Sequence, residues 1–311
     1  MAGSTGRTSS ANIPSNRTSK FLDPLALARL ANIKLIAQSV VEGFISGLHR
    51  SPFKGFSVEF AEYRQYMPGD DLKHFDWKLY ARTEKEYIKQ YQEETNLRVH
   101  ILLDCSASMG FKSTGLSKME YGSFLAASLA YMAIRQQDSC GLVVFDDQMR
   151  TNIAPRSNPQ HLKDILKVLE SVKTTGKTNI AQTLHKMAES IVKRGLIVII
   201  SDLYDDPEAI MKGIHHFRHK RHEVLLFHLM DPAELEFPYE DMVELVDLET
   251  AEKMNVNPVA VREEYLKKIE GFIGRFKNEC SKSDVQYLLF NTEIPFEIAL
   301  ANYLAKRAQL G

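Results

Sequence analysis

The sequence predicts an α/β protein with a doubly wound, mostly parallel sheet and helices on both faces, preceded by an N-terminal helix and a small β-rich segment. From residue 97 onward, short apolar runs typical of buried strands alternate with helical segments. Strands separated by such helical crossovers pair in parallel and place helices on both faces. The 311 residues are 44% hydrophobic and 25% charged, which supplies a full core and excludes a disordered or disulfide-stapled chain.

The N-terminal part divides into three segments. Residues 1–20 contain three basic residues, no acid and no hydrophobic stretch of the kind found in a secretory signal, so we expect a disordered tail. Residues 23–48 repeat apolar side chains at helical spacing and begin with Asp-Pro, an N-cap followed by a first-turn proline. Residues 56–94 are aromatic, β-prone pieces around a turn cluster, which predicts hairpins and one irregular loop.

The remaining elements follow in alternation. Predicted strands are 97–103, 140–145, 148–153, 196–201, 223–230, 243–248 and 285–290. Predicted helices are 118–136, 159–171, 180–193, 207–219, 259–281 and 296–307. Residues 231–238 are expected to form an acidic, proline-bearing loop. The predicted domains are a tail (1–20), an N-terminal helix with a β-rich region (21–96), and an α/β domain with a C-terminal extension (97–311).

Charge and cysteine content exclude several classes of protein. Thirty-nine Lys and Arg balance 40 Asp and Glu, so no global field draws the chain to nucleic acid. Cys105, Cys140 and Cys280 include no CxxC pair, which indicates reduced, buried thiols rather than disulfides or a zinc knuckle. No apolar run approaches the roughly 20 residues of a membrane helix. We therefore expect a cytoplasmic protein.

Oxygen-bearing side chains follow the ends of two predicted strands and precede one predicted helix. Asp104, Ser106 and Ser108 follow the first core strand, Thr178 precedes the helix from residue 180, and Asp202 follows the strand 196–201. Ligands of open α/β sheets bind at the carboxyl ends of the strands. Two carboxylates, three hydroxyls and water form an octahedral set suited to Mg²⁺ or Mn²⁺ rather than zinc. The alternative is structural, because Asp and Ser also cap helices and form turns.

These five residues resemble a known site. Asp104-x-Ser106-x-Ser108, with Thr178 and Asp202 downstream, resembles the metal-ion-dependent adhesion site of von Willebrand factor A domains over about residues 97–230. The resemblance implies that these residues hold a metal ion directly or through water. Two positions depart from the wider pattern: Cys105 lies inside the metal loop, and Leu203 follows Asp202 where many relatives have Gly.

A second resemblance covers most of residues 50–311. Its signature consists of Glu59-Phe60, residues 64–71, Asp76-Trp77, Ala81-Arg82 and Ile88-Lys89. These motifs resemble a bacterial family long labelled domain of unknown function fifty-eight. Members of that family often resemble partners of MoxR-type AAA+ ATPases, and many carry membrane helices. The resemblance implies a von Willebrand factor A-like fold and a MoxR-type ATPase as partner.

The segment around the single tryptophan has two interpretations. Opposite charges, among them Arg64, Asp76 and Arg82, lie close together in sequence around Trp77, which favours a structural ion-pair network. The alternative is a docking surface in which Trp77 and Arg82 are the anchors, as Trp and Arg often are at interfaces.

Other catalytic patterns are incomplete. Gly176-Lys177-Thr178 resembles the end of a P-loop, but Ser171 stands where that motif needs Gly, so ATP binding is not expected. His215 and His219 have the spacing to hold a transition metal, but a solvated basic helix end is the favoured interpretation. Cys105 has no neighbouring histidine and is expected to be a buried residue rather than a nucleophile.

The main hypothesis from these observations is a non-enzymatic, Mg²⁺-dependent protein-interaction module. A carboxylate of the partner protein would complete the metal octahedron, and the partner system would include a MoxR-type ATPase in complex assembly or maturation. The alternative is a small metal-dependent phosphohydrolase that uses the same carboxylates and hydroxyls. Lys177 is its one candidate cation for a transferring phosphate, which weakens this alternative.

Overall fold

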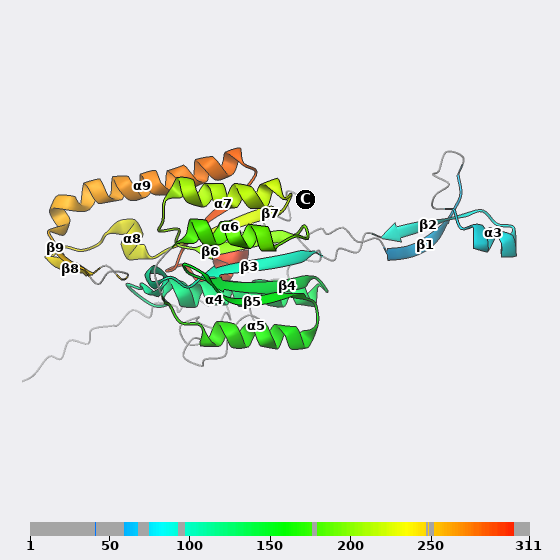
Figure 1. Cartoon of the computed structure of the whole chain (residues 1–311), viewed down its shortest axis with the longest axis horizontal. Helices are drawn as coiled ribbons and strands as arrows, with labels where there is room; N and C mark the ends of the chain where they lie inside the picture. Colours follow the sequence, from blue (N-terminus) through cyan, green and yellow to red (C-terminus); the bar gives the residue numbers. More distant parts are fainter. Residues whose placement is uncertain are drawn as a thin grey trace, which may run out of the picture.

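The structure is a computed structural model that describes residues 41, 59–67, 75–92, 97–175, 179–246, 248 and 252–301. Its centre is a six-stranded sheet in the order β10-β7-β6-β3-β4-β5 (Figure 1). The strands are β3 (Arg98–Asp104), β4 (Ser139–Phe145), β5 (Met149–Arg156), β6 (Leu196–Ser201), β7 (Glu223–Met230) and β10 (Gln286–Asn291). All neighbours pair in parallel except β4 and β5. The predicted mostly parallel α/β fold is therefore confirmed.

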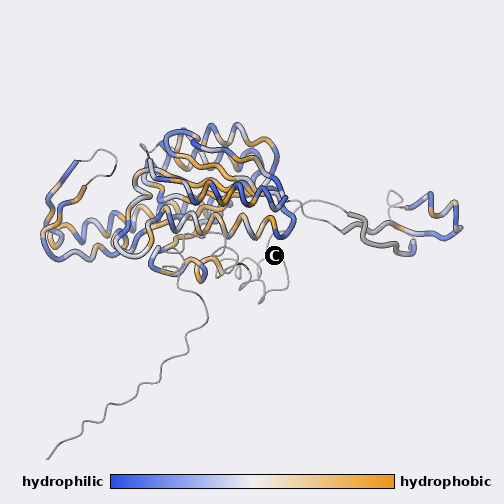
Figure 2. Tube along the Cα trace, turned by 90° about the horizontal axis from the view of Figure 1, so that it is seen from below, coloured by the Kyte–Doolittle hydropathy of each residue, from blue (hydrophilic) through white to orange (hydrophobic). Residues whose placement is uncertain are grey.

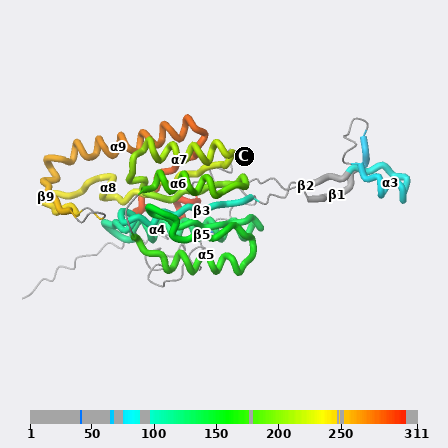
Figure 3. The backbone as a smooth tube through the Cα atoms, in the orientation of Figure 1, coloured from blue at the N-terminus to red at the C-terminus, as the bar shows by residue number. Residues whose placement is uncertain are grey.

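Helices cover both faces of this sheet (Figure 3). α4 (Lys118–Arg135) and α5 (Pro159–Ser171) pack in one hydrophobic cluster. α6 (Ile180–Ser190), α7 (Pro207–His219) and α9 (Pro258–Lys282) pack in the other. Successive residues of β3 pack into opposite clusters: Ile101 lies in the cluster with α4, and Leu102 lies in the cluster with α6. Figure 2 shows the resulting concentration of hydrophobic residues in the centre of the α/β body.

Several predicted boundaries differ from the structure. The helix predicted to reach residue 193 ends at Ser190. The predicted loop after β7 contains a short helix, α8 (Pro232–Glu236), because Asp231 and Glu234 form a capping box around its first turn. The strand predicted from residue 243 is β8 (Val243–Val246), and it pairs antiparallel with β9 (Lys253–Val256), which the sequence analysis did not predict.

The two ends of the chain are described only in part. Val41 is helical, 2% exposed and a member of the cluster around α4, whereas the rest of the predicted helix 23–48 lies outside the described residues. Residues 296–301 are helical, as predicted, and Phe296 stacks on Phe124 of α4 with ring centroids 5.4 Å apart. In the part of the chain that is described, no helix is both long and apolar enough to cross a membrane.

The β-rich segment forms a hairpin with a helix inserted in its connection. β1 (Glu59–Gln65) pairs antiparallel with β2 (Tyr87–Gln92), and α3 (Trp77–Thr83) lies between them in sequence. Phe75 contacts the rings of Trp77 and Tyr80 at centroid distances of 4.5 and 5.7 Å. Trp77 is nevertheless 61% exposed, so the only tryptophan of the sequence is a surface residue.

Candidate metal centre

Four neighbouring parallel strands each deliver an aspartate to the same edge of the sheet. β3 ends at Asp104, Asp146 follows β4, Asp202 follows β6 and Asp231 follows β7. All four side chains are 0% exposed. A buried carboxylate is costly unless hydrogen bonds or cations compensate it. The partners of each aspartate therefore decide what this edge can do.

Asp104 connects the first candidate loop to β6. Its Oδ1 accepts a hydrogen bond from the backbone N–H of Ser106 at 2.8 Å, and its Oδ2 accepts one from Ser201 Oγ at 2.6 Å. Burial, followed by the neighbouring charge of Asp202, raises the pKa of Asp104 to about 7 despite these bonds. This carboxylate is thus held in place by neutral donors, and a cation beside it would favour its ionised form.

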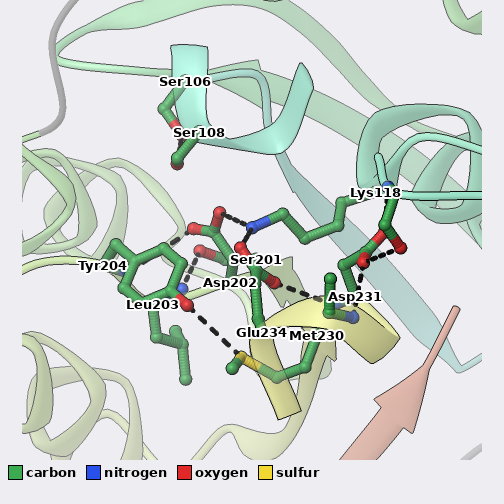
Figure 4. Close-up of polar contacts among 12 residues, drawn as sticks. Ser106, Ser108, Lys118, Ser201, Asp202, Leu203, Tyr204, Met230, Asp231 and Glu234 are labelled. Atoms are coloured by element: carbon green, nitrogen blue, oxygen red, sulfur yellow. Dashed lines mark hydrogen bonds and ion pairs between the residues drawn. The ribbon is translucent and has the colours of Figure 1, made fainter. Parts of the chain in front are cut away.

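The two serines of the first loop lie together. Ser106 precedes a short 3₁₀ turn, η2 (Ala107–Gly110), and Ser108 lies within it. Their Oγ atoms are 3.1 Å apart. Figure 4 shows both side chains extending from η2 toward the region of Ser201 and Asp202. The loop therefore presents two hydroxyl oxygens beside Asp104.

Asp202 is paired with a lysine that the sequence analysis did not identify. Lys118 Nζ lies 2.8 Å from Asp202 Oδ2 and 2.6 Å from Glu234 Oε1, and the side chains of Lys118 and Asp202 are both fully buried (Figure 4). The ammonium also lies 4.8 Å from the ring centroid of Tyr204. Burial opposes the charge of Lys118, but the attraction of Asp202 and Glu234 outweighs it and raises the pKa of Lys118 above its usual value.

One sequence signal pointed to Lys118. It occupies the first position of α4, directly after the N-cap Ser117. A lysine there opposes the helix dipole, and the helix that follows is almost wholly buried. A cation in that position needs acidic partners, which come from α8 and from the loop after β6.

The carboxylates of Asp146 and Asp231 already accept hydrogen bonds from neighbouring loop and strand residues. Asp146 Oδ2 accepts bonds from Arg150 Nε at 2.6 Å and Thr175 Oγ1 at 3.1 Å. Although burial acts in the opposite direction, the Arg150 bond and others hold the pKa of Asp146 below its usual value. Asp231 accepts bonds from the backbone N–H and the hydroxyl of Ser113. These two aspartates fasten loops around the site, and the sequence analysis did not include them.

Thr178 and its neighbours Gly176 and Lys177 lie outside the described residues, so their places in the site stay predictions. The preceding Thr175 donates its backbone N–H to the Cys105 carbonyl at 2.8 Å, which joins this loop to the Asp104 loop. Cys105 is buried, and burial followed by the charge of Asp146 raises its thiol pKa to about 12. The predicted inert role of Cys105 is consistent with that environment.

Asp76 caps α3, accepting hydrogen bonds from the backbone N–H groups of Lys78 and Leu79 at 3.0 and 3.1 Å. The side chain of Arg64 lies outside the described residues, so the ion-pair network predicted around Trp77 stays a prediction. Arg82 is exposed and forms no ion pair with the described residues. Trp77 and Arg82 therefore stay candidates for a docking surface.

The carboxylates and hydroxyls at this edge are oxygen ligands of the kind that a hard dication prefers. Part of their negative charge is already balanced by Lys118 and Arg150. Among the described residues, no three His, Cys, Asp or Glu side chains gather in a cluster able to hold a metal ion. A metal here would depend on the hydroxyls of Ser106 and Ser108 as well as on carboxylates. The ammonium of Lys118 would compete with that metal for Asp202, which limits the affinity expected of the site.

A family model and relatives of known sequence match most of the chain. The family model described as "Protein of unknown function DUF58" matches residues 62–271. An uncharacterised protein of Mycobacterium bovis is 26% identical over 248 residues, 78% of this chain and 77% of that protein. An uncharacterised protein of Mycobacterium tuberculosis shows the same values.

Solved structures with similarity to the chain include three bacterial or von Willebrand factor A proteins. BatB from Bacteroides thetaiotaomicron has a TM-score of 0.46 at 16% identity, and the match covers 68% of this chain and 99% of the BatB chain. An aerotolerance-related membrane protein from Bacteroides fragilis has a TM-score of 0.47 at 17% identity, and the match covers 69% of this chain and 100% of that chain. The SpRpn10 VWA domain has a TM-score of 0.37 at 10% identity, and the match covers 67% of this chain and 95% of that chain. The DUF58 family model matches more than half of the residues of this chain, and the chain therefore belongs to the DUF58 family.

Proposed function

We propose that this chain is a non-enzymatic protein-interaction module that binds Mg²⁺ or Mn²⁺ at the carboxyl edge of its sheet. The metal ligands would be Asp104, Ser106, Ser108, Thr178 and Asp202, directly or through water. The observation that carries the proposal is the pair of serine hydroxyls 3.1 Å apart beside Asp104. Two oxygens bound in cis positions to one Mg²⁺ at about 2.1 Å lie about 3.0 Å apart.

The charge balance favours a partner carboxylate as the remaining ligand. Asp202 shares its charge with Lys118, and the serine hydroxyls are neutral, so a dication at this site would stay incompletely neutralised. An Asp or Glu side chain of a partner protein supplies the missing negative charge and an oxygen ligand. The family resemblance extends the proposal to an adaptor that works in the cytoplasm with a MoxR-type AAA+ ATPase in complex assembly or maturation.

The phosphohydrolase alternative receives less support from the described residues. That reaction needs a cation that can approach the transferring phosphate. The cation found beside Asp202 is Lys118, and its side chain is fully buried between two acids. Lys118 is thus committed to internal pairs, and Lys177, the cation named for this alternative, lies outside the described residues.

The first experiment measures metal binding by the whole chain. We expect Mg²⁺ to raise the melting temperature of wild type by mass action, and Ser108→Ala to reduce that shift with little effect on metal-free stability. Asp241→Ala removes an exposed acid and is the matched control. Equal Mg²⁺ shifts in wild type, Ser108→Ala and Asp104→Ala would remove the site from consideration.

The second experiment measures the partner. A purified MoxR-type ATPase from the same organism is titrated against wild type, Ser108→Ala and Asp241→Ala, with Mg²⁺ or with EDTA. We expect binding that requires Mg²⁺ and is weakened by Ser108→Ala alone. Binding that is unaffected by EDTA would contradict a metal-bridged contact even if the metal shift were observed.

A further inference from the structure

Two histidines on neighbouring helices face each other away from the candidate metal centre. His185 belongs to α6 and His216 to α7. Their Nδ1 atoms are 3.3 Å apart, and their ring centroids are 5.5 Å apart at an interplanar angle of 48°. This pair differs from His215 and His219, whose spacing the sequence analysis interpreted as a solvated helix end; His215 Nε2 lies 2.7 Å from Ser283 Oγ.

The distance between the two rings is fixed by close packing of α6 on α7. A Cβ atom added to Gly213 would lie 2.9 Å from the Leu184 Cβ, so the helices approach at a position that only glycine allows. Leu184 and Ile214 are both fully buried in this contact. His185 follows Leu184 directly, which places the two imidazoles beside a rigid helix contact. Sites on such elements keep their ligand geometry well.

The observed spacing matches the coordination geometry of a tetrahedral metal. Imidazole nitrogens bind Zn²⁺ at about 2.0–2.1 Å, and two such ligands at the tetrahedral angle lie about 3.3 to 3.4 Å apart. The two Nδ1 atoms at 3.3 Å already have that separation. In the metal-free contact one Nδ1 donates its N–H to the other Nδ1. A metal ion would replace that hydrogen bond when the donating ring moves its proton from Nδ1 to Nε2, which frees both Nδ1 lone pairs as ligands.

We propose that His185 and His216 form a two-imidazole site for a transition-metal dication, and that the bound metal clamps α6 to α7. Imidazole ligands suit Zn²⁺, Cu²⁺ and Ni²⁺, whereas Mg²⁺ and Mn²⁺ prefer oxygen. The site is therefore chemically separate from the carboxyl-edge site. The two helices it would join begin close in sequence to predicted ligands of that other site, since α6 starts two positions after Thr178 and α7 starts five positions after Asp202.

The residues around His185 and His216 lead us to expect a moderate affinity for the metal ion. No third His, Cys, Asp or Glu joins this pair among the described residues, so water completes the coordination shell. The Lys220 ammonium is anchored on the neighbouring end of α6 through the carbonyls of Ala188 and Glu189 at 2.7 and 3.1 Å. Its positive charge opposes a second cation nearby. We therefore expect Zn²⁺ binding that is tighter than that of a single surface histidine but weaker than that of a four-ligand structural site.

The test uses the metal-free full-length protein and Zn²⁺ alone. We expect one Zn²⁺ per chain by titration calorimetry and a raised melting temperature. His185→Gln and His216→Gln should each weaken binding by about tenfold or more, which corresponds to ~1.4 kcal/mol. His219→Gln removes another exposed histidine of α7 and should leave binding unchanged.

Two further comparisons separate this site from the proposed function. Asp104→Ala should keep the Zn²⁺ affinity, and His216→Gln should keep the Mg²⁺-induced shift of the melting temperature. The proposal is overturned if wild type binds no Zn²⁺, or if His219→Gln weakens binding as much as His216→Gln does. It is also overturned if Zn²⁺ binding is lost in Asp104→Ala while both histidine variants retain it.

Discussion

Lys118→Met tests the electrostatics at the centre of the candidate site. The substitution keeps an unbranched side chain but removes the ammonium that lies 2.8 Å from Asp202 Oδ2 and 2.6 Å from Glu234 Oε1. Asp202 is fully buried and Glu234 is 12% exposed, so both carboxylates lose their cation in a region with little water. Removing one partner of a buried ion pair costs about 3–5 kcal/mol. We expect the free energy of unfolding to fall by that amount in metal-free buffer.

Magnesium distinguishes an ordinary buried ion pair from a competitor of the metal. In the variant, the released Asp202 carboxylate is available to a dication. We therefore expect Mg²⁺ to restore part of the lost stability and to bind at least about tenfold more tightly than to wild type, a gain of ~1.4 kcal/mol. Urea unfolding and magnesium titration measure the two effects, with Lys112→Met, an exposed lysine, as the control. Unchanged magnesium affinity in Lys118→Met would refute the competition between Lys118 and the metal.

Three further predictions concern parts of the chain away from this site. Asp76→Ala removes the N-cap of α3 and should cost about 1 kcal/mol in thermal unfolding, whereas an unchanged curve would show that the cap is dispensable. Burial raises the pKa of Asp138 from 3.8 to about 7, so the folded state binds this proton more tightly than the unfolded state and wild-type stability falls as the pH rises across that interval. Urea midpoints over this pH range should fall less in Asp138→Asn, and parallel profiles would contradict the assignment. Deleting residues 1–20 should not change the melting temperature, but deleting residues 1–48 should cost about 2 kcal/mol because Val41 is buried, and equal stabilities would show that this segment does not support the core.

The sheet could be predicted because each strand carries its own local pattern. β6 consists of five consecutive apolar residues followed by Ser201, all of them buried, and its neighbours alternate with amphipathic helices. The carboxyl-edge placement of Asp104 and Asp202 follows from that order alone. β9 was missed although Lys253–Val256 alternate polar and apolar residues, because four mostly exposed residues form too short a pattern to stand out from a loop. The capping box of α8 was visible as Asp231 and Glu234, but the proline between them suggested a loop.

The partners inside the candidate site could not be predicted because they are distant in sequence. Lys118 lies 84 positions before Asp202 and 116 before Glu234, and no local pattern connects such residues. Ser201 was a strand residue in the sequence analysis, yet its hydroxyl holds Asp104. Local spacing thus identified the candidate metal ligands, whereas the groups that compensate their charge depended on the tertiary fold.

The compensating groups also bear on why a dication would bind at this edge. The aspartates that follow the four parallel strands and Glu234 of α8 place five acidic side chains along this part of the fold: Asp104, Asp146, Asp202, Asp231 and Glu234. Among the described residues, their ion pairs involve two cations, Lys118 and Arg150. Asp104 and Asp231 are instead stabilised by neutral donors such as Ser201 and Ser113. If the proposed metal binds here, carboxylates that hydrogen bonds already hold in place would receive it without a rearrangement of the chain. The ammonium of Lys118 would then limit the metal affinity, because the metal would have to compete with it for the carboxylate of Asp202.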